Sequence, residues 1–114
     1  MDTEFKQGAL TEVVFFILLS TLRPCHGYAV MQNIKSLTNG RVNIGAGTMY
    51  GAINTLLAKQ WISAVCHDVE SRKKEYVTTE IGVHVLQNEL IRLQELYAIG
   101  MNEINKKDGD NREN

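Results

Sequence analysis

The last third of the chain carries an apolar stripe that is too long for the rest of the chain to cover. Its large apolar residues recur at intervals of three and four, the spacing of one helix face. They are Leu86, Leu90, Leu93, Tyr97, Met101 and Ile104. Thr79 is a suitable N-cap and Glu80 an acidic first-turn residue for a helix predicted over residues 79–105, roughly 40 Å long. In a chain of 114 residues, this dimerisation helix predicts a homodimer that buries the stripe between two copies.

Five shorter elements precede this helix, and together they predict a mainly α fold with a small β-hairpin. Apolar residues at helical intervals indicate three helices, and two short apolar-polar alternations around a charged segment indicate an antiparallel hairpin. Pro24 and Gly27 end the first helix and predict a turn or short loop. The predicted helices span residues 7–22, 28–37 and 46–60, and the predicted strands are Ile62–Val65 and Glu75–Thr78.

Three glycines lie in the segment GAGTMYG, residues 45–51, where the third helix begins. A dinucleotide-binding loop would need a strand before the glycines and a parallel strand after the helix, and a P-loop would need Gly-Lys-Ser or Gly-Lys-Thr. Neither context is present in this sequence. Small residues at a helix start instead let the backbone approach DNA phosphates, which the free N–H groups of the helix can bind. With the hairpin and its basic tip, this pattern predicts a winged helix-turn-helix domain over residues 7–78.

Three motifs in this order resemble the PadR family of transcriptional regulators: HGYAV at residues 26–30, GTMYGAINTLLAKQWI at 47–62 and ESRKKEYVTTEIG at 70–82. The resemblance extends from about residue 8 to residue 96. It implies a dimeric repressor whose dimer interface often hosts an apolar or aromatic effector. The sequence departs from the family pattern at Ala29, Gly51, Gln60 and Trp61, and none of these changes removes the DNA-binding architecture.

Two groups of polar residues are the predicted contacts to double-stranded DNA. The first group, on the third helix, is Gly47, Thr48, Tyr50, Asn54 and Thr55, and the second, at the hairpin tip, is Arg72, Lys73 and Lys74. Hydroxyl and amide groups can bond phosphates or base edges, and the cations can bond phosphates. For the first group the alternative is a solvated helix face, and for the second it is a charged turn. Tyr50 could instead pack under the wing, which is the hairpin of residues 62–78. Because the net charge is −1, DNA binding would depend on this local cluster.

A possible effector pocket is predicted where the first and last helices of the dimer meet. Its residues would be Phe15, Phe16, Leu93 and Tyr97, although each could equally be plain core. Lys35 and Arg41 are further candidates for DNA backbone contacts. The pairs Cys25-His26 and Cys66-His67 could bind a metal or sense oxidants, but their spacing matches no standard zinc pattern. No metal and no cofactor is expected.

Several other classes of protein fit the sequence poorly. The apolar run over residues 13–22 is too short to cross a membrane, which needs about 20 residues. Two cysteines and an acidic N-terminus without a basic leader favour a cytoplasmic protein. The histidines and cysteines form no recognisable catalytic set, so we do not expect an enzyme. The remaining alternative is a winged-helix adaptor that binds proteins and has no operator. Residues 106–114 are polar and are predicted to be a disordered tail.

Overall fold

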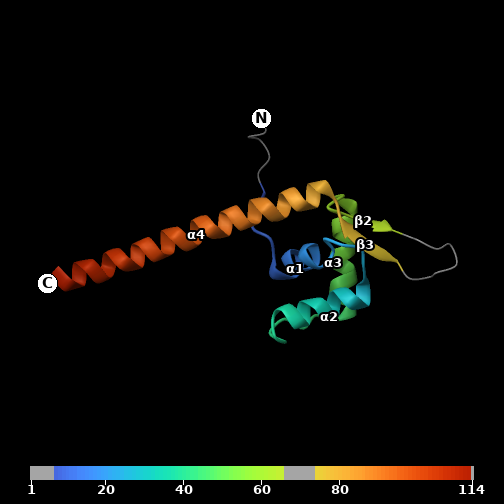
Figure 1. The fold of residues 1–114 in the computed structure, drawn as a ribbon, viewed down its shortest axis with the longest axis horizontal. Helices are drawn as coiled ribbons and strands as arrows, with labels where there is room; N and C mark the ends of the chain where they lie inside the picture. The colour runs from blue at the N-terminus through green and yellow to red at the C-terminus, as the bar shows by residue number, and fades with distance from the viewer. Residues whose placement is uncertain (1–6, 66–73, 114) are drawn as a thin grey trace.

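The computed structural model describes residues 7–65 and 74–113. These residues form four helices and a small antiparallel sheet, with α4 as one long rod across the body (Figure 1). The elements are α1 (Glu12–Ser20), β1 (Cys25–His26), α2 (Gly27–Leu37), α3 (Ala46–Ala58), β2 (Ile62–Val65), β3 (Glu75–Thr78) and α4 (Glu80–Glu113). The predicted mainly α winged-helix fold with a long last helix is confirmed.

The sheet has three strands in the order β1-β3-β2, one more than the sequence predicted. Strands β2 and β3 have the predicted bounds, and they pair antiparallel with Ile62 opposite Thr78 and Val65 opposite Glu75. The extra strand, β1, pairs Cys25 with Tyr76 in the segment that was predicted to be a turn. Two residues are too few to show the alternation of a strand, so only their pairing with the distant β3 defines them as one.

Helix α1 begins five residues later than predicted. The hydroxyl of Thr11 accepts a bond from the Val14 N–H at 3.2 Å and thereby caps the helix. Before the cap, the side-chain amide of Gln7 donates to the carbonyl of Val85 on α4 at 3.0 Å. The segment before Thr11 is therefore attached to α4, and it does not extend α1.

The core lies where α1, α2, α3, the sheet and the first turns of α4 meet. Every one of these elements contributes at least one buried apolar side chain. The buried set is Ile17, Leu18, Val30, Ile34, Met49, Ile53, Leu56, Ile62, Tyr76, Val85 and Leu86. On α2 the buried positions are Gly27, Val30 and Ile34. Tyr28, the second residue of α2, is exposed.

The buried Thr21 and the half-buried Thr78 attach the sheet to α1. Thr21, which follows α1, donates from its hydroxyl to the Ile17 carbonyl at 2.8 Å and lies 2.8 Å from the hydroxyl of Thr78 on β3. The Thr78 backbone N–H also donates to the Thr21 carbonyl at 2.6 Å. These bonds satisfy polar groups that burial would otherwise leave unpaired. They fix the base of the wing against the helical body.

Helix α4 starts as predicted but continues further than predicted. The Thr79 hydroxyl accepts from the Gly82 N–H at 3.1 Å, which confirms Thr79 as the N-cap. At the other end the helix continues through Glu113, which contradicts a disordered tail over residues 106–113. No proline interrupts the polar segment, and Lys106 pairs with Glu103 at 3.3 Å along the helix. At 1.5 Å per residue the 34-residue helix is about 51 Å long, and its second half projects beyond the other elements (Figure 1).

Candidate nucleic-acid interface

Helix α3 presents one polar face to solvent and one apolar face to the core. Met49, Ile53 and Leu56 are buried. The five predicted contact residues of this helix, Gly47, Thr48, Tyr50, Asn54 and Thr55, are all exposed. The Thr55 hydroxyl donates back to the Gly51 carbonyl at 3.2 Å, and its oxygen can still accept a further bond. The structure therefore places these five residues on one accessible helix.

The entrance to α3 is open. Gly45 is the N-cap residue, and no side chain caps the first N–H groups of the helix. A Cβ atom added at Gly45, Gly47 or Gly51 would meet nothing within 4 Å. None of the three has a positive φ angle. Neither internal packing nor backbone geometry requires these glycines, and each leaves open space beside the backbone.

Tyr50 lies at the junction of α2, α3 and the wing. Its ring occupies the space that a side chain at Gly27 would need, yet 42% of the residue is still exposed. The same concavity is lined by His26, Tyr28, Ala29, Lys74 and Tyr76. Burial, followed by the nearby Tyr50, raises the pKa of the Tyr76 phenol. Tyr50 is thus both packed beside the wing base and accessible from outside.

The base of the wing is tied to the start of α2. His26 Nε2 lies 3.4 Å from Glu75 Oε2, and His26 Nδ1 lies 3.4 Å from the carbonyl oxygen of Lys74. Lys74 itself is exposed at the edge of the concavity. Arg72 and Lys73, the other two predicted wing cations, lie outside the described residues. Of the predicted basic cluster, the structure therefore places only Lys74 near α3.

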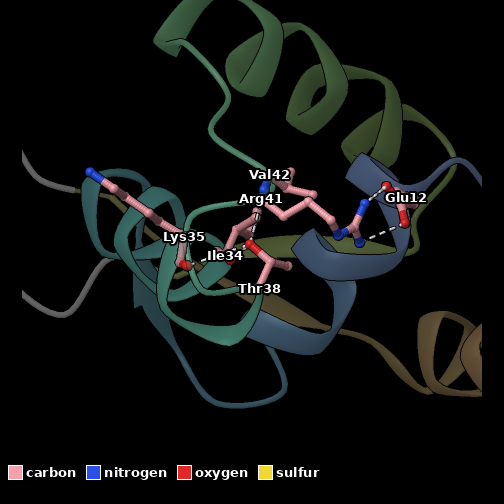
Figure 2. A network of polar contacts seen from close by, with 6 residues as sticks. All are labelled: Glu12, Ile34, Lys35, Thr38, Arg41 and Val42. Carbon is pink, nitrogen blue, oxygen red and sulfur yellow. Dashed lines mark hydrogen bonds and ion pairs between the residues drawn. The ribbon is translucent and has the colours of Figure 1, made fainter.

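The turn between α2 and α3 is held by a polar network (Figure 2). The guanidinium of Arg41 donates two bonds to the Glu12 carboxylate of α1, at 3.1 and 2.8 Å. Within the turn, the Thr38 hydroxyl donates to the Ile34 carbonyl at 2.9 Å and accepts from the Val42 N–H at 3.0 Å. The Arg41 hydrogen bonds lower the pKa of Glu12. Arg41 thus has a partner in an exposed ion pair, and its role as a DNA contact stays a prediction.

The projecting part of α4 exposes the predicted dimerisation stripe, with one exception. Leu86 is 4% exposed and belongs to the core of its own chain, so its assignment to the interface is corrected. The other five residues are between 41% and 71% exposed. They are Leu90, Leu93, Tyr97, Met101 and Ile104. An apolar strip of this length is the kind of surface that proteins use to bind other proteins.

The predicted effector residues do not enclose a pocket in the single chain. Phe15 and Phe16 are half-buried neighbours on α1, with ring centroids 5.5 Å apart in an edge-to-face arrangement. Leu93 and Tyr97 lie on the exposed part of α4, with Tyr97 71% exposed. The effector pocket stays a prediction.

Cys25 lies in surroundings that disfavour its thiolate. Burial, followed by the negative charge of Glu75, raises the pKa of the Cys25 thiol, whereas a reactive cysteine needs a lowered pKa. Cys66 and His67 lie outside the described residues. Among residues 7–65 and 74–113, no cluster of three His, Cys, Asp or Glu side chains could hold a metal. No helix in this part of the chain is long and apolar enough to span a membrane.

The sequence matches the transcriptional regulator PadR-like family over residues 16–88. A comparison with curated proteins gives no match. Among solved structures, a transcriptional regulator from Clostridium thermocellum and a PadR family transcription regulator from Clostridium difficile R20291 both align with a TM-score of 0.63 and 21% identity. The alignments cover 83% and 80% of this chain, and 90% and 96% of those chains.

BpsR from Bordetella bronchiseptica shares the fold as well. Its TM-score is 0.63 at 18% identity, and the alignment covers 85% of this chain and 69% of that chain. The DNA binding of BpsR is regulated by 6-hydroxynicotinic acid. Identities below 25% establish a common fold and no more. The matched family and the two Clostridium proteins are regulators of transcription.

Proposed function

Because this chain belongs to the PadR-like family of transcriptional regulators, we propose that it is a cytoplasmic, homodimeric repressor that binds double-stranded DNA at an inverted-repeat operator. The observation that carries the proposal is the exposed polar face of α3 with its open glycine entrance. A face of this kind fits a major groove, where amide and hydroxyl groups reach base edges and helix N–H groups reach a phosphate.

In this arrangement Asn54 and Thr55 read base edges, while Thr48 and Tyr50 bond the DNA backbone. Gly47 lets the backbone of α3 come close to a phosphate, because no side chain stands in the way. Lys74, with Arg72 and Lys73 of the wing, supplies positive charge for the phosphates that flank the groove. Phosphate contacts set the register, and base contacts set the sequence preference.

A dimer would hold two α3 helices at a fixed separation. We assign the dimer interface to the exposed stripe of α4, since its five large apolar residues stand in water in the single chain. A two-fold interface of this kind matches an operator with two half-sites. The spacing of the half-sites would follow from the angle at which the two α4 helices cross.

We further propose that a small apolar or aromatic effector at the dimer interface releases the DNA. The support is the position of Phe15, Phe16, Leu93 and Tyr97, together with the regulation of BpsR by an aromatic acid. An effector can shift the protein only if it binds one arrangement of the two α3 helices better than the other. If no effector that is added to the protein changes its operator affinity, this part of the proposal fails and the proposal of DNA binding survives.

Fluorescence anisotropy with a labelled duplex from upstream of the protein's own gene tests DNA binding. The matched control is a scrambled duplex, and both are measured over a salt series. We expect tight, sequence-selective binding that weakens steeply as salt rises. Replacing Arg72, Lys73 and Lys74 by alanine should reduce the slope of log K against log salt by up to about 5, from six lost phosphate contacts per dimer. Weak and equal binding to several duplexes would favour the protein-binding adaptor.

A further inference from the structure

At the candidate interface a glycine of α2 and a tyrosine of α3 lie against one another. Gly27 is the buried first residue of α2, and Tyr50 comes from the first turns of α3. A Cβ atom at Gly27 would lie 2.8 Å from Tyr50 Cζ and 3.0 Å from Cε1, and it would overlap the hydroxyl oxygen. The tyrosine ring therefore occupies the space that any side chain at Gly27 would take.

Backbone conformation does not explain a glycine at this position. Among the described glycines, only Gly40 has a positive φ angle, so Gly27 has a backbone geometry that other residues can adopt. It begins a helix, where alanine has a better propensity than glycine. The glycines near the entrance of α3 differ, since Cβ atoms at Gly45, Gly47 and Gly51 meet nothing within 4 Å. Space for the Tyr50 ring is what distinguishes Gly27.

We propose that Gly27 is a positioning residue for DNA recognition: it lets the Tyr50 ring pack against the start of α2 and so sets where the Tyr50 hydroxyl meets the DNA backbone. The inference rests on the proposed function, because it concerns the use of Tyr50 at that interface. The ring also shares its concavity with Lys74 and Tyr76 of the wing. Through this one side chain, the positions of α2, α3 and the wing base depend on one another.

Gly27→Ala is a clean probe, because the atom it displaces is the far end of a flexible side chain. The variant should keep its fold and its melting temperature, while the ring turns away from α2. Gly82 provides the contrast. A Cβ at Gly82 would strike the backbone carbonyl of Trp61 and lie 2.5 Å from Thr78 Cγ2, so Gly82→Ala should lower the melting temperature. Gly8→Ala, at an exposed site with nothing within 4 Å, controls for the added methyl group.

A double-mutant cycle on operator affinity tests the inference. We expect Gly27→Ala and Tyr50→Ala each to weaken binding by roughly tenfold or more, the effect of losing a hydrogen bond to a charged group. In the Tyr50→Ala background, Gly27→Ala should have no further effect, since the ring it would displace is gone. An additive double mutant would overturn the inference, because Gly27 would then act without Tyr50. Wild-type operator affinity of either single variant, Gly27→Ala or Tyr50→Ala, would also overturn the inference.

NMR contacts between the Gly27 Hα protons and the Tyr50 ring give a readout that is independent of DNA. They should be present in the wild-type protein, and the Tyr50 ring should lose its contacts to residue 27 in Gly27→Ala. Reduced DNA affinity with an unmoved ring would contradict the positioning role. Failure of the wild-type protein to bind any duplex would instead remove the proposed function, and the inference with it. Binding by the wild type and an unaffected Gly27→Ala variant would remove the inference alone.

Discussion

Helices α3 and α4 both leave one long face in solvent, but the two faces have opposite chemistry. The outer face of α3 consists of glycines, hydroxyls and an amide, with Thr48 and Asn54 as examples. The projecting part of α4 exposes large apolar side chains such as Leu93 and Tyr97. Exposed fraction alone does not distinguish them, since Tyr50 and Leu93 are 42% and 41% exposed. Chemistry does, because an extended apolar strip is unfavourable in water whereas a polar face is not.

The two faces also differ in how the chain supports them. Helix α3 is anchored along its length by Met49, Ile53 and Leu56 in the core. Helix α4 is anchored only near its start, by Val85, Leu86 and the buried Glu89. A face meant to read DNA needs a rigid support, which α3 has. In the proposed dimer the free part of α4 would gain such a support from the second chain. The proposed interface on α4 would then be a condition for accurate spacing of the two α3 helices.

Leu93→Asp should produce the largest effect, by breaking the apolar face of α4. Burying one leucine is worth about 1.5–3 kcal/mol, and a two-fold interface contains it twice. The dimer dissociation constant should therefore rise by roughly 10²- to 10⁴-fold, as measured by analytical ultracentrifugation. Asn102→Asp is the control, because it adds the same charge nine residues further on, about half a turn around the helix. A dimer that survives Leu93→Asp would place the interface elsewhere.

Asn54→Ala should produce the next largest effect, on the polar face of α3. If its amide bonds a base edge, its loss should cost about 1–3 kcal/mol in discrimination, or roughly 5- to 150-fold in operator affinity. Affinity for a scrambled duplex should change little, so anisotropy with both duplexes separates base reading from general binding. Asn88→Ala removes the same amide from an exposed site on α4 and should leave both affinities unchanged. An equal loss with both duplexes would assign Asn54 to the backbone.

Sequence reasoning found both faces because each follows from periodicity within one element. The stripe from Leu90 to Ile104 and the buried positions of α3 repeat every three or four residues. The strands Ile62–Val65 and Glu75–Thr78 have the bounds that the sequence predicted. What it missed depends on contacts between distant segments. Strand β1 is defined only by its pairing with β3. Leu86 is buried in the core and not on the exposed stripe, because the core extends that far along α4.

The contact between Gly27 and Tyr50 was missed for the same reason. The segments HGYAV and GTMYG show a glycine and a tyrosine, but nothing in their spacing says that one fills the space left by the other. The prediction that Tyr50 is either a DNA contact or packed by the wing assumed that these exclude one another. Its partial exposure beside the wing base makes both compatible.

Lys74→Ala should test the α3 side of the molecule alone, because it removes a positive charge beside α3 and leaves α4 unchanged. One lost phosphate contact in each subunit should reduce the slope of log K against log salt by about 2 for the dimer. Specificity for the operator over a scrambled duplex should persist, because phosphate contacts carry no sequence information. Lys107→Ala, an exposed lysine on α4, should leave the slope unchanged. A change of slope in both variants would mean that net charge, and not the place of Lys74, governs the response.

The smallest effect concerns Glu89, which marks the boundary between the packed and the projecting parts of α4. Hydrogen bonds from Arg92, at 2.9 and 2.7 Å, are the main cause of a pKa below the ordinary 4.5 for this carboxyl, against the opposing effect of burial. The charge of Arg92 and the Leu10 backbone N–H lower it further. A carboxyl whose pKa is lower in the folded state stabilises the fold above its unfolded pKa, and this contribution is lost as pH falls through the folded value.

Glu89→Gln should therefore lower the melting temperature by a few degrees at pH 7, and the difference from wild type should shrink below about pH 4.5. Thermal unfolding over pH 3 to 7 measures both. Glu12→Gln is the matched control, since Arg41 also lowers the pKa of Glu12, but that pair is exposed and should matter less. Equal effects of the two variants at pH 7 would mean that the burial of Glu89 adds nothing to its pairing with Arg92 along the same helix. Glu89 would then no longer count among the residues that anchor α4 to the body.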